Sequence, residues 1–243
     1  MKTALITGGS GGIGAATAKM LASDGFSVIL TYNKHQDRAL QTIAGLSCYD
    51  IATGCYQMDV ANSSSVNETA HKILEDFGHI DVLVNNAGIA KSGLLIDMSD
   101  EDWNKIVSVN LTGCFNVCRA FLPQMYARNS GTVINISSIW GQTGAACEVA
   151  YSTTKAGVIG LTKALAKESA KMGVRVNCIA PGVVDTPMMD CYNDNEKSEL
   201  CDEIPLGRFA AADEIASVVS FLACEKSSYI TGEVISVNGG FLI

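Results

Sequence analysis

The sequence has little proline, few histidines and a low share of charged residues. Four prolines and three histidines occur among 243 residues, and 17% of residues are charged, against about 25% in an average soluble domain. Hydrophobic residues make up 48% of the chain, which is enough for a large core and argues against disorder. This length favours one domain, residues 1–243. No uninterrupted apolar run reaches about 18 residues, so we expect no membrane span.

Positive charge is also scarce. Lys and Arg total 17 and Asp and Glu total 25, so the formal net charge is −8. A broad basic face for DNA or RNA is therefore not expected, and neither is a polybasic membrane patch. The histidines have no metal-binding spacing, so we expect no metal site.

Paired cysteine motifs are absent. The chain has nine cysteines, an odd number, and no Cys-x-x-Cys pair, which argues against a disulfide framework or a zinc ribbon. We expect most of them to be buried as small apolar side chains, and Cys114 and Cys118 to be packed rather than bridged. With an apparent strand at the start instead of a signal peptide, this predicts a cytoplasmic protein.

Short apolar segments alternate with helical stretches along the whole chain. Unbroken runs such as Val-Ile-Leu are typical of strands buried on both faces of a parallel sheet. The βαβ order predicts a single Rossmann-type, doubly wound α/β domain with a seven-stranded, mostly parallel sheet and helices on both faces. The expected strands are Thr3–Thr7, Ser27–Thr31, Thr53–Met58, Val82–Asn85, Thr132–Ile136, Arg175–Ala180 and Glu233–Val237.

Three further segments have recognisable local signals. Ser99 and Asp102 predict the N-cap and third residue of a helix. Ala150–Met172 has helical spacing and is followed by Gly173, a suitable residue to end a helix. Residues 187–205 are polar, acidic and irregular, so we expect a mobile loop or small helical lid over a binding site.

A glycine-rich turn follows the first expected strand. Gly8, Gly12 and Gly14 form a T-G-x-x-x-G-x-G pattern that leads into a helix. Glycines let the backbone approach a pyrophosphate, and the helix N-terminus offers free N–H groups. Ala15 and Ala16 follow where a phosphate-loop NTPase would need Lys and Ser or Thr. The pattern therefore favours a dinucleotide, with a turn that binds nothing as the alternative.

The end of the second expected strand bears on the choice of cofactor. An NAD site usually places a carboxylate there for the ribose 2′-hydroxyl, but no acid occurs before Asp37. Asn33 and Lys34 suit a 2′-phosphate instead, so we expect NADP(H) rather than NAD(H). Lys34 as an ordinary solvated lysine is the alternative, and Gly11 stands where a basic residue would have strengthened the preference.

Tyr151 and Lys155 are four residues apart on a predicted helix and share one face. A tyrosine has an ordinary pKa of about 10, and an adjacent ammonium stabilises its phenolate. The pair therefore suits proton transfer to or from an alcohol oxygen. Ser138 follows the fifth expected strand, at the edge where open α/β sheets bind ligands, and can hold the same oxygen. Ser137 is an alternative that the pattern leaves open.

Together these motifs resemble the short-chain dehydrogenase/reductase family. The resemblance implies that Tyr151 donates the proton to a ketone, that Lys155 lowers the pKa of Tyr151 and binds the nicotinamide ribose, and that Ser138 polarises the carbonyl. Asn110 would interrupt its helix and hold a water behind Lys155. The segments that carry the resemblance span nearly the whole chain: Thr7–Gly14, Asn85–Gly88, Asn110, Ser138, Tyr151 with Lys155, Pro181–Thr186, Tyr229–Glu233 and Asn238–Gly240.

The resemblance also implies a cofactor site and an assembly. The adenine would lie against the residues after the third strand, and the nicotinamide against those after the sixth. A homotetramer would form with the helices 104–125 and 150–172 at one interface. The implied cofactor contacts are Gly8, Ser10, Gly12, Ile13, Gly14, Asn33, Lys34, Asp59, Val60, Asn86, Ala87, Gly88, Tyr151, Lys155, Pro181, Gly182, Val184 and Thr186.

The chain as a whole most resembles 3-oxoacyl-acyl-carrier-protein reductases, which reduce a β-keto thioester with NADPH. Residues 137–151 are instead similar to a bacterial subgroup that reduces a 5-aminopentanone group on elongation factor P. Glu148 would attract such an amine, with an acid favoured by the helix dipole as the alternative. The expected substrate contacts are Ser138, Trp140, Glu148 and Tyr151.

An acidic carrier protein would need a basic docking face, for which Arg128, Lys171 and Arg175 are the candidates. Another small-ketone reductase remains an alternative. A cofactor-binding regulator without catalysis is a remote one, because all four catalytic positions are occupied.

Overall fold

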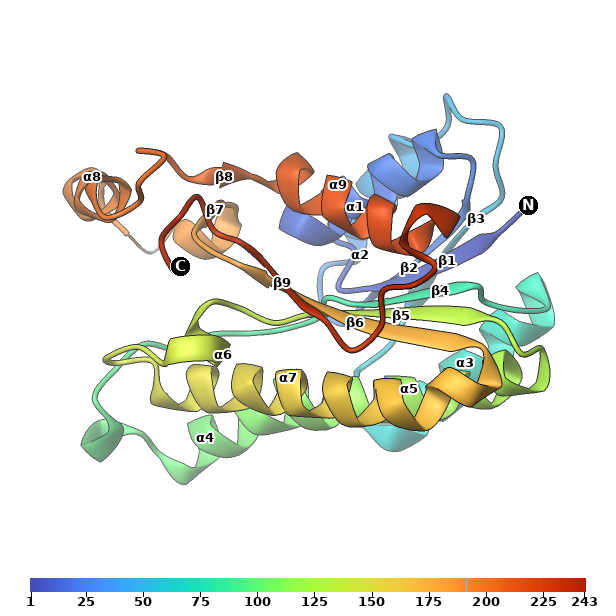
Figure 1. The fold of residues 1–243 in the computed structure, drawn as a ribbon, viewed down its shortest axis with the longest axis horizontal. Helices are drawn as coiled ribbons and strands as arrows, with labels where there is room; N and C mark the ends of the chain where they lie inside the picture. The colour runs from blue at the N-terminus through green and yellow to red at the C-terminus, as the bar shows by residue number, and fades with distance from the viewer. Residues whose placement is uncertain (191) are drawn as a thin grey trace.

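The computed structural model describes residues 1–190 and 192–243, and its centre is one seven-stranded sheet (Figure 1). Every pair of neighbouring strands in this sheet is parallel. The predicted Rossmann-type α/β fold is confirmed. In spatial order the strands are β3 (Thr53–Gln57), β2 (Ser27–Tyr32), β1 (Thr3–Thr7), β4 (Val82–Asn85), β5 (Gly131–Ile136), β6 (Val174–Pro181) and β9 (Val234–Val237).

Helices cover both faces of the sheet (Figure 1). Each face has its own buried core, with Leu21 wholly buried on one side and Phe121 on the other. This double cover explains the unbroken apolar strands. One layer contains α1 (Gly12–Ser23), α2 (Gln36–Ala44) and α9 (Ala212–Ala223), and the other contains α3 (Ser63–Phe77), α4 (Asp100–Val107), α5 (Gly113–Ala127) and α7 (Val149–Ser169).

The helix ends follow the sequence signals. The Ser99 hydroxyl accepts a hydrogen bond from the backbone N–H of Asp102 at 3.1 Å, so the predicted N-cap of α4 is confirmed. α7 continues into the 3₁₀ turn η3 (Ala170–Met172) and ends at Gly173, which has the left-handed φ of 68°. Glycine adopts this conformation without steric cost.

The helical run Asp100–Ala127 is long and apolar enough to cross a membrane by length and composition, and among the described residues it alone meets that test. Half of its most apolar window is buried. The buried side chains of α5 belong to the core beneath the sheet, which accounts for the apolar composition. Between α4 and α5 the run contains a π-helical turn, η2 (Ser108–Thr112).

Small elements gather at the carboxyl ends of the strands, on the left in Figure 1. The expected lid, residues 187–205, contains a 3₁₀ turn and one short helix, with Cys191 outside the described residues. A pair of two-residue strands was not predicted, because two residues carry no periodicity. These elements are η1 (Leu95–Asp97), α6 (Trp140–Thr143), β7 (Val184–Asp185), η4 (Pro187–Met189), α8 (Asp194–Asp202) and β8 (Ala210–Ala211).

The expectation that most cysteines are buried is wrong. Among the eight described cysteines, all free, only Cys114, Cys118 and Cys178 are buried, while Cys48 and Cys147 are exposed. Sequence patterning could not place the others, because a small thiol is tolerated at the surface and in the core alike. Cys114 and Cys118 are packed without a bridge, as predicted.

Candidate active site

The glycine-rich turn joins β1 to α1 at the point where the strand order reverses, with β2 on one side of β1 and β4 on the other. Open α/β sheets bind dinucleotides at this position. Gly8 and Gly12 have φ values of 67° and 53°, which only glycine adopts readily. A Cβ on Gly14 would collide with the carbonyl oxygen of Gly8. These glycines are therefore required by the close packing of the turn.

One residue of the turn is free of such constraints. A Cβ on Gly11 would have no other atom within 4 Å, and the φ of 167° at this residue is extended. Gly11 is the N-cap of α1, makes no side-chain cap, and α1 has no acid in its first turn. Among the described residues, no side chain bonds to the first N–H groups of α1, and the open space before them fits a pyrophosphate.

Asn86 holds the turn against β4. Its Nδ2 donates to the carbonyl oxygens of Thr7 and Gly8 at 3.1 and 3.0 Å. The Thr7 hydroxyl accepts from the backbone N–H of Asn86 and of Ala87, both at 3.1 Å. The side-chain amide predicted to contact the cofactor is thus used within the protein, and it positions the glycine turn.

The remaining cofactor candidates lie along the same edge of the sheet. Asn33 and Lys34 follow β2 and are exposed, and Asp59 and Val60 follow β3. The Thr186 methyl group would be 3.2 Å from a Cβ on Gly12, so the segment after β6 reaches back to the glycine turn. The sheet order brings these separate segments into one row.

Lys155 lies on α7 and is 4% exposed. Its Nζ donates to the carbonyl oxygen of Ile136 at 2.8 Å and lies 5.5 Å above the centre of the Tyr151 ring. Burial lowers the pKa of Lys155 to about 8. A Cβ on Gly88 would be 3.5 Å from this Nζ, so the backbone after β4 faces the ammonium directly.

Asn110 lies in the π-helical turn, as its predicted interruption of a helix requires. Its Oδ1 accepts from the N–H of Ile89 at 2.8 Å, and its Nδ2 donates to the Ile89 carbonyl and the Thr154 hydroxyl. Asn110 therefore ties the loop after β4 to α7. A cavity of about 10 Å³ next to it matches roughly one water, and the buried Oδ1 of Asn85, one of its lining residues, has no partner in the described chain.

The structure separates the two candidate serines. The Ser138 hydroxyl lies close enough to Tyr151 to lower the pKa of that phenol. Ser137 instead donates to the carbonyl oxygen of Lys155 at 2.8 Å. Only Ser138 is therefore available to share a substrate oxygen with Tyr151.

The pKa of Tyr151 differs from the expected direction. Burial raises it to about 12, the Ser138 hydroxyl opposes this, and the negative charge of Glu148 raises it further. Lys155 is not among the causes of this shift, so its predicted lowering of the Tyr151 pKa stays a prediction. The lysine lies over the ring face and bonds to a backbone carbonyl, so desolvation of the phenolate dominates.

Glu148 is the N-cap residue of α7 and makes no side-chain cap. Its Oε1 accepts a short hydrogen bond from the Ser92 hydroxyl, and its Oε2 is buried without a partner in the described chain. The pattern gave no signal for Ser92, which lies in the loop after β4. A carboxylate oxygen that has no partner and lies close enough to affect Tyr151 can accept a hydrogen bond or ion pair from a ligand.

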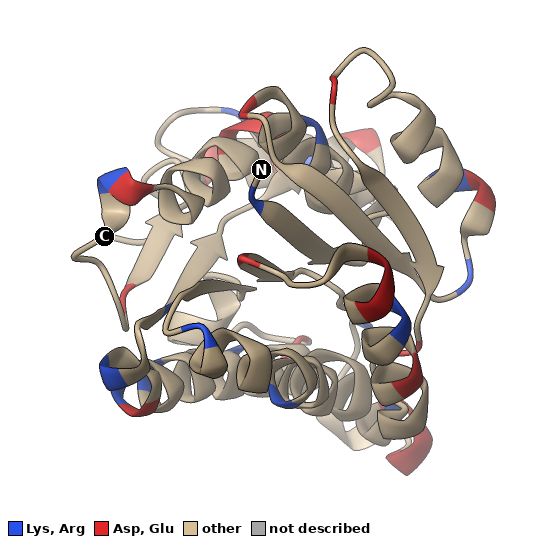
Figure 2. Cartoon of the chain, turned by 90° about the vertical axis from the view of Figure 1, so that its right-hand side faces the viewer, with Lys and Arg blue, Asp and Glu red and all other residues tan. Residues whose placement is uncertain are grey.

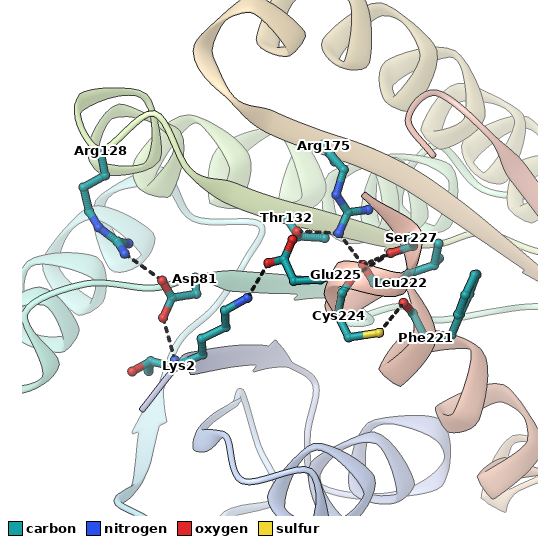
Figure 3. Close-up of polar contacts among 11 residues, drawn as sticks. Lys2, Asp81, Arg128, Thr132, Arg175, Phe221, Leu222, Cys224, Glu225 and Ser227 are labelled. Atoms are coloured by element: carbon teal, nitrogen blue, oxygen red, sulfur yellow. Dashed lines mark hydrogen bonds and ion pairs between the residues drawn. The ribbon is translucent and has the colours of Figure 1, made fainter. Parts of the chain in front are cut away.

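The candidate basic docking residues lie at the other edge of the sheet, which faces the viewer in Figure 2. Arg128 precedes β5 and pairs with Asp81 at 2.7 Å. Arg175 is the second residue of β6 and donates to the Thr132 hydroxyl and the Leu222 carbonyl (Figure 3). Both arginine side chains therefore have ion-pair or hydrogen-bond partners within the chain. Within this chain they do not form a docking face beside Tyr151, because strand ends of opposite polarity are separated by the length of the sheet.

Comparison with known proteins agrees with this geometry. A family model described as Enoyl-(Acyl carrier protein) reductase matches residues 8–242. A 3-oxoacyl-acyl-carrier-protein reductase FabG of Staphylococcus epidermidis is 41% identical over 239 residues, 98% of each chain. The corresponding proteins of Thermotoga maritima and Chlamydia trachomatis serovar D are 40% and 42% identical, over 100% and 98% of this chain and 98% and 96% of their own.

The chain belongs to the short-chain dehydrogenase/reductase family. As a short-chain dehydrogenase/reductase it is an oxidoreductase, and its relatives cover it almost end to end. The crevice along the carboxyl ends of the strands is therefore its candidate active site.

Proposed function

We propose that this chain reduces a ketone to a secondary alcohol with NADPH, and that it accepts 3-oxoacyl thioesters as its FabG relatives are named to do. One observation carries the proposal. The hydroxyl of Ser138 lies close enough to Tyr151 to act on the pKa of its phenol, beside the buried ammonium of Lys155. This triad lies at the end of the crevice that starts at the glycine turn.

NADPH, when bound, supplies a hydride to the carbonyl carbon. The turn around Gly11 would hold its pyrophosphate and Gly88 would face its nicotinamide ribose. Thr186, which reaches the glycine turn, would close the nicotinamide side. These residues support a dinucleotide that runs from the glycine turn to Tyr151 along the carboxyl ends of the strands.

The protein's own groups complete the reaction by moving a proton. A pKa of about 12 keeps the Tyr151 phenol protonated at neutral pH, so it can donate to the carbonyl oxygen while Ser138 donates to the same oxygen. The nearby ammonium of Lys155 stabilises the phenolate once it forms. A water in the small cavity by Asn110 would return the proton to this pair. We also propose a lid role for α8, a homotetramer and a cytoplasmic location.

The direct test is NADPH oxidation with an acetoacetyl thioester. An enoyl thioester serves as the comparison, because the matching family model is described as an enoyl reductase. Oxidation with the ketone and none with the alkene supports the proposal. No oxidation with any β-keto thioester at high enzyme concentration refutes it.

Replacing Lys34 by Ala tests the choice of cofactor. Lys34 is exposed at the end of β2, and loss of one charged contact to the 2′-phosphate should raise the KM for NADPH by about 10-fold, corresponding to roughly 1.4 kcal/mol. The KM for NADH should stay within twofold. Equal effects on both cofactors would show that Lys34 does not recognise the phosphate.

A second candidate is reduction of an aminoketone, the 5-aminopentanone group on elongation factor P. The unpartnered Oε2 of Glu148 favours it, because an ammonium would satisfy this oxygen. In a strain that lacks the gene, the modified elongation factor should differ by the mass of two hydrogens. An unchanged mass would exclude this candidate.

The charge distribution also favours the second candidate. Residues 185–203 carry seven carboxylates and one lysine, and residues 91–105 carry four carboxylates and two lysines, so these segments together hold the entire net charge of −8. Both lie at the end of the molecule that contains α6 and α8 (Figure 1). Like charges at this end would repel an acidic carrier protein.

Glu148→Gln separates the two substrates. Without the carboxylate, kcat/KM for an aminoketone should fall about 10-fold or more, in line with loss of a charged hydrogen bond, while that for an uncharged ketone should change little. Glu148 raises the pKa of Tyr151, so the variant should also shift the alkaline limb of the rate profile to lower pH. An unchanged substrate preference and an unchanged profile would remove Glu148 from the site.

A further inference from the structure

The segment after β9 contacts the substrate side of the candidate site. The ring of Phe241 meets the indole of Trp140 edge to face, with 5.4 Å between ring centres. Ser236, in β9, donates to the Oε1 of Gln142 at 3.0 Å. Phe241, after β9, and Ser236, within β9, therefore make two separate contacts with the four-residue helix α6.

α6 depends on such contacts for its position. It has four residues, no buried side chain and no side-chain cap, and an isolated helix of this length is not stable. Its other side lies against α7, where a Cβ on Gly141 would be 2.8 Å from the carbonyl oxygen of Lys155. α6 is thus held between the backbone of Lys155 and the segment after β9.

The turn formed by residues 238–240 positions Phe241 against Trp140. The Oδ1 of Asn238 accepts from the N–H of Gly240 at 3.0 Å, and its Nδ2 donates to the carbonyl oxygen of Leu242 at 2.8 Å. Gly239 and Gly240 have φ values of 63° and 86°, which favour glycine. The Asn-Gly-Gly sequence therefore fixes the direction in which the Phe241 ring leaves the backbone.

The contact reaches the reacting groups in two steps. The backbone N–H of Trp140 donates to the Oγ of Ser138 at 3.2 Å, and the Ser138 hydroxyl lies close enough to Tyr151 to act on its phenol. A shift of Trp140 therefore moves the hydroxyl that would hold the ketone oxygen.

The same turn also contacts the segment that follows α8. The carbonyl oxygen of Gly239 accepts from the N–H of Leu206 at 3.1 Å, and a Cβ on Gly240 would be 3.2 Å from the Pro205 ring. The turn thus lies between α6 and the base of the proposed lid.

We propose that Phe241 is a positioning residue for the ketone, acting through Trp140 and Ser138. This inference rests on the proposed reductase function. It predicts that loss of the Phe241 ring impairs use of the ketone while leaving cofactor binding intact, because the ring itself packs on the Trp140 indole and the backbone contact of Asn238 with Gly182 does not involve it.

The test compares Phe241→Ala with Phe241→Tyr, which keeps the ring, and with Tyr229→Ala, which removes a fully exposed aromatic side chain elsewhere. Phe241→Ala should lower kcat/KM for the ketone by about 10-fold to 100-fold, as expected when a reacting group is misplaced. The Kd for NADPH should stay within twofold. Phe241→Tyr and Tyr229→Ala should both match the wild type within twofold.

A spectroscopic measurement makes the test independent of turnover. The chain has two tryptophans, so Trp103→Phe leaves Trp140 as the single emitter, and Phe241→Ala in that background should shift its emission to longer wavelength. Ser236→Ala, which removes the hydroxyl contact from an exposed position, should lower kcat/KM in the same direction by a smaller factor.

The proposal is overturned if Phe241→Ala keeps kcat/KM within twofold, or if Phe241→Tyr loses as much activity as Phe241→Ala. A parallel loss of NADPH binding and melting temperature would also overturn it, because that outcome indicates general destabilisation. If the wild type turns over no ketone, the proposed function fails, and the Trp140 emission still decides whether Phe241 sets the position of the indole.

Discussion

Tyr151→Phe should lower the turnover of ketones by about 100-fold to 10,000-fold, the range expected for loss of a general acid. The phenol oxygen is the group on which Ser138 acts, and phenylalanine removes only that oxygen. The ring beneath the Lys155 ammonium stays. NADPH should therefore bind with a Kd within a few-fold of the wild type, measured by titration of cofactor fluorescence alongside steady-state rates.

The matched control is Tyr229→Phe, which removes a phenol oxygen from a fully exposed side chain and should change neither rate nor affinity. Rates of Tyr151→Phe within tenfold of the wild type would assign the proton to another donor. The same experiment separates an enzyme from a cofactor-binding regulator. A regulator would bind NADPH in both proteins and show no turnover to lose.

Gly14→Ala should weaken NADPH binding by about 10-fold to 100-fold. The added methyl group would collide with the carbonyl oxygen of Gly8 and lie 2.7 Å from the Nδ2 of Asn86. Both are held, since Asn86 itself bonds to the carbonyls of Thr7 and Gly8, so the turn must open. Overpacking of this kind costs about 1–3 kcal/mol, and if this cost falls on the bound state the Kd for NADPH rises by about 10-fold to 100-fold.

Gly11→Ala in the same turn is the matched control. Its Cβ would meet no described atom within 4 Å and its backbone is extended, so stability should not fall, and affinity should fall less than in Gly14→Ala. Isothermal titration of both variants, with melting temperatures measured in parallel, distinguishes a local effect from unfolding. Equal affinity in the two variants would show that close packing of the turn does not control binding.

Much of the fold could be predicted from the sequence because a doubly wound sheet produces local signals at every step. All seven strands of the main sheet lie within two residues of their predicted ends. The central strands are buried on both faces and therefore appear as apolar runs, whereas the edge strands β3 and β9 are only partly buried. Two helix ends were recognisable from single residues. The Ser99 side chain caps the start of α4, and Gly173 ends the helix with a left-handed φ. The glycine turn was recognisable for the same reason, because positive φ values require glycine.

Contacts between segments far apart in sequence could not be predicted in this way. The pattern left Ser137 and Ser138 open, and only the packing of α7 on β5 directs one hydroxyl to Lys155 and the other to Tyr151. Ser92, Phe241 and the small strands β7 and β8 carry no local signal, since each matters through a partner from another part of the chain.

The fold, the dinucleotide turn, the Tyr151–Lys155 pair and the net charge all follow from the order of the amino acids. The environment of each group follows only from folding. Burial raises the pKa of Tyr151, internal partners occupy Arg128 and Arg175, and the two acidic segments around α4 and α8 come to lie at the same end of the molecule (Figure 1). The physical reason is that backbone preferences act over a few residues, whereas desolvation and charge act through space between segments that only folding brings together.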